Sequence, residues 1–203
     1  MMKTLELFSG SKSFSKVAKK LGMQTLTIDN DLETKPDICI DIMDFEIDLL
    51  MGYKPVIIWS SPPCEKFSVL QIGKNWINGN PPIPKNLETL KAIKIVKKQF
   101  EIIKKLKPKY WYVENPRAMF RKVFNTYPFA TVTYCQYGYK YMKPTDIFTN
   151  NYNWISKAKS CKNGDSCHEK APRGSSRGLR SIKNKKLRGA IPPKLIMEIL
   201  KNG

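Results

Sequence analysis

Long apolar stretches are missing from this sequence. Its 203 residues contain no run of about 18 uninterrupted apolar residues, the length that a membrane-spanning helix needs. The first residues, Met1 to Glu6, also lack the apolar centre of a signal peptide. We therefore expect a protein that has no membrane partner and resides in the cytoplasm.

Histidine is nearly absent, and the cysteines follow no repeating spacing. The cysteines are odd in number, so we expect reduced thiols: Cys39, Cys64, Cys135, Cys161 and Cys167. Zinc ligands usually come in pairs two to four residues apart, whereas Cys161 and Cys167 are separated by five residues and adjoin only His168. With three candidate ligands and no obvious fourth, we expect no metal site. Nothing in the sequence ties His168 to a role as general base.

Acidic residues are few relative to basic ones. The chain has 36 Lys and Arg against 17 Asp and Glu, a net charge of +19. Residues 151–203 hold 13 basic and 3 acidic residues, so about half of the excess lies in the last quarter. Such an imbalance favours a polyanionic partner, with nucleic acid the first candidate. The alternative is a lysine-rich set of solvated helix faces.

The order of apolar segments predicts an α/β fold. The length and the 41% hydrophobic content suit one domain with a full core. We expect strands at residues 4–8, 24–28, 37–41, 56–59 and 110–113, and helices at about 12–21 and 87–106. Alternating strands and helices imply a mostly parallel twisted sheet with helices on both faces. The core-facing side of the second helix is expected to consist of Leu87, Leu90, Ile93, Val96, Phe100, Ile103 and Leu106.

Polar residues follow the predicted strands, where ligands of parallel sheets bind. They are Ser9, Gly10, Asp29, Asp41, Cys64 and Glu114. Cys64 follows two prolines, which fix φ and remove N–H donors, so we expect a rigid turn that points the thiol outward. The alternative for Cys64 is a small buried apolar residue. Its place after a turn, beside charged neighbours, favours a nucleophile.

The first strand, turn and helix are typical of a nucleoside-cofactor loop. Gly10 permits close approach of a ligand to the backbone, and a carboxylate such as Asp29 accepts hydrogen bonds from ribose hydroxyls. A dinucleotide loop needs three glycines and only Gly10 is present, so a ribose-containing cofactor without a pyrophosphate, such as S-adenosylmethionine, fits better. The alternative for Asp29 and Asp31 is a solvated turn that caps a helix.

Several motifs together resemble the cytosine-C5 DNA methyltransferases. In order, they are Glu6-Leu7-Phe8-Ser9-Gly10, Pro62-Pro63-Cys64-Glu65-Lys66-Phe67-Ser68, Glu114-Asn115-Pro116, Tyr134-Cys135-Gln136-Tyr137-Gly138 and Ile191-Pro192-Pro193-Lys194-Leu195. The similarity is strongest to short, phage-type members, which implies the cytoplasm of a host cell as one location. It implies a single-domain Rossmann-like methyltransferase fold: a catalytic core at 1–150, a reduced basic target-recognition-like insert at 151–186, and a C-terminal segment at 187–203 that returns to the core.

The resemblance also implies roles for individual residues. The catalytic residues would be Cys64, Glu114, Pro63 and Asn115, with Cys64 adding to cytosine C6, Glu114 holding the base and Asn115 bracing the loop. S-adenosylmethionine would be bound by Phe8, Ser9, Gly10, Asp29, Asp41, Pro62 and Pro193. Double-stranded DNA with a flipped cytosine would contact Lys140, Lys143, Arg173, Arg177 and Arg180. The protein is expected to be a monomer.

This chain departs from the family pattern at several places, one of them Pro116, which follows Glu114-Asn115 where valine is usual. Lys12 and Ser13 stand where the first loop usually has glycines, and Lys140 and Lys143 stand for an arginine pair. The DNA-reading region is small, which predicts low sequence selectivity. An RNA or tRNA cytosine methyltransferase, a non-catalytic nucleic-acid-binding relative, and transfer of a group other than methyl remain as alternatives.

Overall fold

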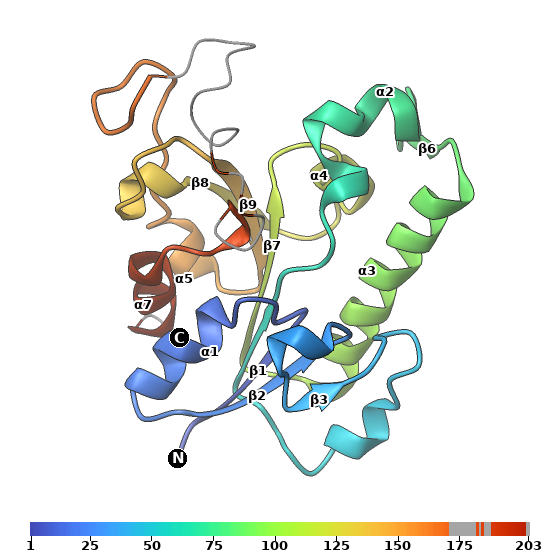
Figure 1. Cartoon of the computed structure of the whole chain (residues 1–203), viewed down its shortest axis with the longest axis vertical. Coiled ribbons are helices and arrows are strands. Elements are labelled where there is room, and N and C mark those ends of the chain that lie inside the picture. Colours follow the sequence, from blue (N-terminus) through green and yellow to red (C-terminus); the bar gives the residue numbers. More distant parts are fainter. Residues whose placement is uncertain (171–181, 183, 185–187, 202–203) are drawn as a thin grey trace.

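A seven-stranded, mostly parallel sheet forms the centre of the molecule (Figure 1). The structure is a computed structural model and describes residues 1–170, 182, 184 and 188–201. The strand order is β3-β2-β1-β4-β7-β9-β8. The strands are β1 (Lys3–Leu7), β2 (Gln24–Asp29), β3 (Ile38–Cys39), β4 (Ile57–Ser60), β7 (Tyr110–Pro116), β8 (Phe129–Thr133) and β9 (Pro144–Thr149).

The directions of the strands place the ends of five of them along one edge. Strands β3, β2, β1, β4 and β7 run parallel, whereas β9 is antiparallel to both β7 and β8. A small separate ribbon of β5 (Trp76–Ile77) and β6 (Ile83–Pro84) lies beyond β4 in the chain. The predicted fold class is confirmed. The carboxyl ends of the parallel strands, called the strand-end edge below, are where a ligand of such a sheet binds.

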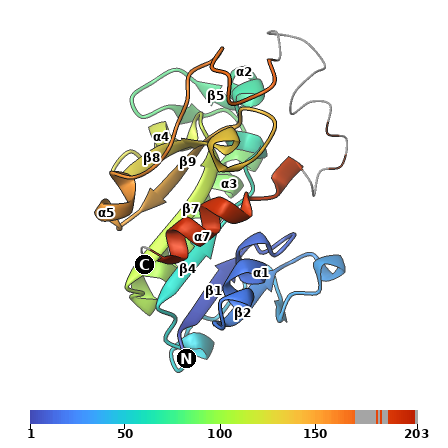
Figure 2. The same ribbon diagram turned by 90° about the vertical axis from the view of Figure 1, so that its left-hand side faces the viewer.

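Helices cover both faces of the sheet (Figures 1 and 2). On one face α1 (Ser13–Lys20) packs beside α7 (Pro193–Lys201), although these helices are far apart in the sequence. The other face carries α3 (Leu87–Leu106). The shorter helical segments are α2 (Ile72–Asn75), α4 (Phe120–Val123), α5 (Tyr152–Ile155) and the 3-10 turns η1 (Leu32–Thr34), η2 (Ile47–Leu50), η3 (Glu65–Phe67), η4 (Val69–Gln71) and η5 (Tyr134–Tyr137). None of the helices in the described part of the chain has both the length and the apolar character needed to cross a bilayer.

Helix α3 occupies the predicted range, but its buried side differs from the prediction. Asn86 caps its start by accepting a hydrogen bond from the Thr89 amide at 2.9 Å. Leu87 and Leu90, which we expected to face the core, are 71% and 41% exposed. The buried side of α3 is instead Thr89, Ala92, Val96, Gln99, Phe100, Ile102 and Ile103. It is rotated relative to the predicted side, and it includes only Val96, Phe100 and Ile103 of the residues we expected there.

Strand β7 is longer than the sequence pattern suggested. We expected the strand to end at Val113 and Glu114 to follow it. Instead Glu114 and Asn115 lie within β7, because they pair with Ile147 and Asp146 of β9. The carboxylate of Glu114 is therefore held by a rigid strand rather than by a loop. Strand β3 is shorter than expected because only Ile38 and Cys39 pair with β2.

Candidate active site at the strand-end edge

The loop between β1 and α1 is wound tightly by residues in left-handed backbone conformations. Phe8, Gly10 and Lys12 have φ values of 54°, 41° and 55°. Gly10 suits this conformation because it has no side chain to clash. Its amide donates a 2.8 Å hydrogen bond to Asp29 Oδ2 at the end of β2. Asp29 therefore holds the loop in shape and links the ends of β1 and β2, a contact that the sequence did not predict.

Glu6 is the most unusual carboxyl group of this region. Only 3% of the residue is exposed, and its oxygens accept hydrogen bonds from the amides of Phe14 (3.2 Å) and Ser15 (2.9 Å), which belong to the first turn of α1. Burial raises the pKa of Glu6 to about 7, although the Ser15 and Phe14 amides and Lys12 favour the charged form. Sequence reasoning quoted Glu6 in a motif but did not assign it to the site.

A cavity of about 400 Å³ opens over this loop. Of the predicted cofactor residues, Phe8, Ser9 and Gly10 line it. The other lining residues are Glu6, Ser11, Ser13, Asp31, Thr34, Ser61, Gly189 and Ile191. The segment that precedes α7 thus closes the cavity, and the Ile191 amide donates to Ser13 Oγ at 3.2 Å.

The remaining predicted cofactor residues do not line this cavity. Asp29 braces the loop, and Asp41 is exposed and accepts a hydrogen bond from the Met43 amide at 2.9 Å. Pro62 is buried next to the lining residue Ser61. Pro193 starts α7 and lines a neighbouring cavity of about 520 Å³. The carboxylate that does line the 400 Å³ cavity from the β2 side is Asp31, which sequence reasoning had considered only beside Asp29.

Cys64 lies in the turn after β4, directly before η3. Pro63 is exposed and the Cys64 residue is partly exposed. Burial raises the pKa of the thiol, the charge of Glu114 raises it further, and the charge of Lys143 lowers it. The thiol therefore interacts electrostatically with both groups, although Lys143 lies 79 positions further along the sequence.

Glu114 is buried and has two partners from the β9-β8 edge of the sheet: Tyr134, which follows β8, and Lys143, which precedes β9. The Tyr134 hydroxyl donates a hydrogen bond to Glu114 Oε1 at 2.9 Å, and Lys143 Nζ lies 3.9 Å from the same oxygen. Lys143 Nζ also lies 4.6 Å from the centre of the Tyr134 ring and donates to the Arg188 carbonyl at 3.2 Å. Burial, followed by the charge of Glu114, holds the pKa of Tyr134 well above its ordinary value, so the hydroxyl stays a donor. Tyr134 was missed as a site residue although it opens one of the quoted motifs.

The other predicted residues are placed differently. The Asn115 side chain is fully buried, and neither its oxygen nor its nitrogen has a hydrogen-bond partner in the described residues, so it is not seen to brace a loop there. Lys140 is exposed, and its backbone carbonyl accepts a hydrogen bond from the Glu169 amide at 2.8 Å. Arg173, Arg177 and Arg180 lie outside the described residues.

The strand-end edge therefore combines a partly exposed thiol, a buried carboxylate, a lysine and a cavity beside the β1 loop. A larger cavity of about 670 Å³ lies elsewhere, over α3 and the start of β7, and is lined by Phe100, Trp111 and Tyr127 among others. It contains none of the strand-end residues, so we assign the chemistry to the strand-end edge.

A curated viral protein is similar to this chain over nearly the full length of both. The chain is 31% identical over 221 aligned positions to a protein of Frog virus 3 (isolate Goorha) named probable DNA (cytosine-5)-methyltransferase. The alignment covers 98% of this chain and 99% of that protein. The chain belongs to the DNA (cytosine-5)-methyltransferase family. No protein-family model matches the chain.

Solved methyltransferase structures share the fold. A putative DNA modification methyltransferase encoded within an E. coli prophage superposes with a TM-score of 0.53 at 14% identity, covering 73% of this chain and 46% of that one. The Entamoeba histolytica methyltransferase EhMeth gives a TM-score of 0.52 at 11% identity, covering 84% and 58%. The chain thus spans about half the length of these larger proteins, while it matches the full length of the viral one.

Proposed function

We propose that this family member transfers the methyl group of S-adenosylmethionine to C5 of cytosine in DNA, through a covalent bond between Cys64 and C6 of a flipped base. The observation that supports this most directly is the grouping of Cys64, Glu114 and Lys143 at the strand-end edge, beside the cavity of the β1 loop. The resemblance assigned Cys64 and Glu114 from separate motifs. Their electrostatic interaction is a property of the fold.

The cavity of the β1 loop suits a cofactor with a ribose and a positively charged sulfonium. Its lining offers the Asp31 carboxylate, hydroxyl groups of Ser9, Ser11 and Ser13, and the buried carboxyl of Glu6. Within the part of the chain that the structure describes, the lining has no lysine or arginine to bind phosphate. We propose that Asp31, rather than Asp29, accepts hydrogen bonds from the ribose, because Asp31 lines the cavity and Asp29 does not. Both oxygens of Asp29 accept backbone amides, those of Gly10 and Asp31, each at 2.8 Å. Asp31 caps η1 with one oxygen, which accepts the Glu33 amide at 3.0 Å. When bound, S-adenosylmethionine supplies the methyl group on its sulfonium.

Cys64 would act as the nucleophile. Cytosine C5 is a poor nucleophile until a thiolate adds to C6, which places electron density on C5. S-adenosylmethionine, held in the cavity of the β1 loop, would supply the methyl carbon to which C5 bonds, and S-adenosylhomocysteine would be left. Loss of the C5 proton and departure of the Cys64 thiolate would restore the aromatic ring and leave 5-methylcytosine.

Glu114 and Lys143 would have opposite effects on this step. Tyr134 occupies Glu114 Oε1, which leaves Oε2 to receive a hydrogen bond from the polar edge of cytosine. The negative charge of Glu114 disfavours the Cys64 thiolate, whereas the ammonium group of Lys143 favours it. A cytosine that binds Glu114 would partly neutralise this charge, so the thiolate would form mainly when the base is in place.

DNA is the proposed substrate because the chain belongs to a family of DNA methyltransferases and because its net charge of +19 favours a polyanion. The Cys64 thiolate can reach C6 only when the cytosine is flipped out of the base stack. We propose that Arg173, Arg177 and Arg180 contact phosphates. Replacing all three with alanine should weaken DNA binding for every sequence and reduce the slope of log Kd against log salt concentration, as fluorescence anisotropy measures. An unchanged salt slope would exclude these arginines from the interface.

The covalent step is tested by trapping. Duplex DNA that contains 5-fluorocytosine cannot lose a proton from C5, so incubation with radiolabelled S-adenosylmethionine should give a labelled protein–DNA adduct that survives denaturing electrophoresis. The adduct should be absent in Cys64→Ala and present in Cys39→Ala, which removes an exposed thiol of β3. An adduct with fluorinated RNA but not with DNA would instead establish an RNA enzyme. No adduct with either would refute the covalent mechanism.

A further inference from the structure

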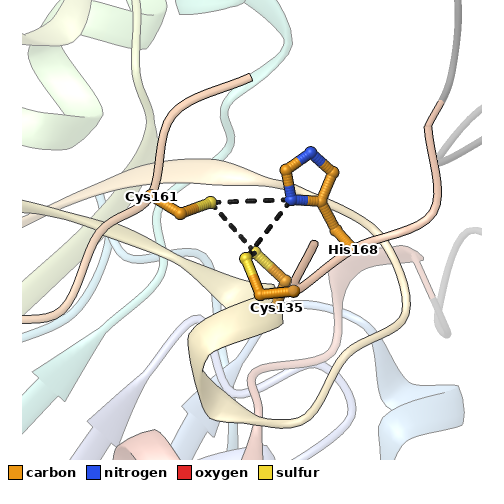
Figure 3. A group of neighbouring side chains, drawn as sticks. Cys135, Cys161 and His168 are labelled. Carbon is orange, nitrogen blue, oxygen red and sulfur yellow. Dashed lines mark hydrogen bonds between the residues drawn. The ribbon is translucent and has the colours of Figure 1, made fainter. Parts of the chain in front are cut away.

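Four potential metal ligands meet beside the catalytic sheet, and only two of them, Cys167 and His168, are adjacent in the sequence. Cys135 lies in η5 after β8, and Cys161, Cys167 and His168 come from the segment that follows α5. All four donor atoms lie within 4.8 Å of one another. Figure 3 shows Cys135, Cys161 and His168 pointing toward one another. The fourth ligand that the sequence did not reveal is therefore Cys135.

We propose that Cys135, Cys161, Cys167 and His168 bind one structural Zn²⁺ ion. Zinc–sulfur bonds of about 2.3 Å and zinc–nitrogen bonds of about 2.0 Å in a tetrahedron separate sulfurs by about 3.8 Å and sulfur from nitrogen by about 3.6 Å. The Cys135 sulfur lies 3.3 Å from that of Cys161 and 3.8 Å from that of Cys167. His168 Nδ1 lies 3.7 Å from the Cys161 sulfur and 3.4 Å from the Cys167 sulfur. These four distances lie within about 0.5 Å of the tetrahedral values.

The identity of the ligands favours zinc over harder cations. Three thiols and one imidazole form a soft donor set that binds Zn²⁺ well and binds Mg²⁺ and Ca²⁺ poorly. A closed set of four protein ligands is typical of structural sites, since catalytic zinc keeps one position for water or substrate. Three thiolates and one Zn²⁺ carry a net negative charge, and Lys159, Lys162 and Lys170 lie in the same stretch of sequence.

Backbone hydrogen bonds bring the ligands together. The Cys161 amide donates to Thr133 Oγ1 at 3.0 Å, and the Thr133 amide donates to the Lys159 carbonyl at 3.2 Å. On the other side, the Glu169 amide donates to the Lys140 carbonyl at 2.8 Å. The segment is thus attached next to Cys135 both before Cys161 and after His168, which places the ligands without a metal having to gather a free chain.

A metal would give this segment stability that its own side chains do not supply. Residues 156–170 contain no helix or strand, and of these residues only Ala158 packs against a hydrophobic cluster of the described chain. Segments too small for a core of their own commonly rely on a metal or a disulfide. The metal would also fix the turn η5, which carries both Cys135 and Tyr134, the hydrogen-bond partner of Glu114. At its other end it would fix His168, which precedes Arg173 by five positions in the sequence.

A disulfide is the competing explanation. A disulfide needs two sulfurs about 2.05 Å apart. It would join two of the three cysteines and would not explain why the third thiol and the imidazole lie in the same cluster. The convergence of all four donors, rather than of two, is what favours the metal.

The test is the zinc content of the protein purified without a histidine tag. We expect about one zinc per chain by mass spectrometry of the metal, as one tetrahedral site requires. Cys167→Ser should lose the zinc, and because Cys167 is exposed this change should leave folding largely intact. Cys39→Ser, which removes another exposed thiol, should retain it. Removal of zinc by a chelator should lower the Tm of the wild-type protein but not that of Cys167→Ser.

Cobalt substitution and thiol counting give a second readout on the wild-type protein. Co²⁺ should produce a thiolate-to-cobalt charge-transfer band in the near ultraviolet and the strong visible bands of a tetrahedral site. Absence of zinc with five free thiols after denaturation would overturn the proposal. Absence of zinc with three free thiols would establish a disulfide and overturn it as well. None of these outcomes depends on methyl transfer, so failure of the metal site and failure of the proposed function are separable.

Discussion

Glu6→Gln should remove a pH dependence of stability that arises from one buried carboxyl group. Burial raises the pKa of Glu6 from 4.5 to about 7. Because the folded-state pKa is the higher one, the folded protein binds this proton more tightly than the unfolded chain does. Its stabilising contribution is complete below the unfolded pKa and is lost as the pH rises through the folded pKa. The shift of 2.5 pH units corresponds to roughly 3 kcal/mol in total, and about 2 kcal/mol of this is lost between pH 5 and pH 7.

Urea unfolding at pH 5 and pH 7 measures this effect. Glutamine is neutral at both pH values, so the free energy of unfolding of wild type relative to Glu6→Gln should fall by about 2 kcal/mol from pH 5 to pH 7. Any loss of hydrogen bonds from the Phe14 and Ser15 amides adds a constant offset. The difference between the two proteins cancels contributions from other sites, and Glu101→Gln, at an exposed position of α3, is the matched control. A difference between wild type and Glu6→Gln that is independent of pH would refute the argument.

Two further predictions concern charges near buried groups. Glu114→Gln should speed alkylation of the Cys64 thiol by iodoacetamide at neutral pH, because the charge that raises its pKa is removed, yet lower methyl transfer by about 10²-fold or more. Lys143→Met should slow the same alkylation, and changes in the same direction for both variants would contradict the assigned charges. Arg121→Met should cost about 3–5 kcal/mol in urea unfolding, because it leaves the buried Asp146 carboxylate without its cation. A loss below about 1 kcal/mol, the range of an exposed ion pair, would refute this reasoning.

The alternation of apolar segments predicted the fold class, because parallel strands and amphipathic helices leave clear periods in a sequence. The predicted helix 87–106 has the same ends as α3, because neighbouring residues set both of them. Asn86 caps the start, and Lys107 adopts a left-handed conformation directly after Leu106. The exposure of Leu87 and Leu90 was not predictable from periodicity, because periodicity shows which residues share a face but not which elements pack against that face. The inclusion of Glu114 in β7 likewise depends on pairing with β9, a contact between segments about 30 residues apart.

The sequence by itself determined which chemical groups are available: a cysteine after a rigid diproline turn, a carboxylate near another strand end, a single-glycine loop and a large positive charge. The first three are encoded by neighbouring residues, and the charge follows from the composition of the whole chain. The tertiary structure alone decided which groups meet. It brought Tyr134 and Lys143 to Glu114, placed Asp31 rather than Asp29 in the cavity, and set Cys135 beside Cys161, Cys167 and His168. Such contacts follow from the strand order β7-β9-β8 and the path of the chain after α5, and no local spacing records them.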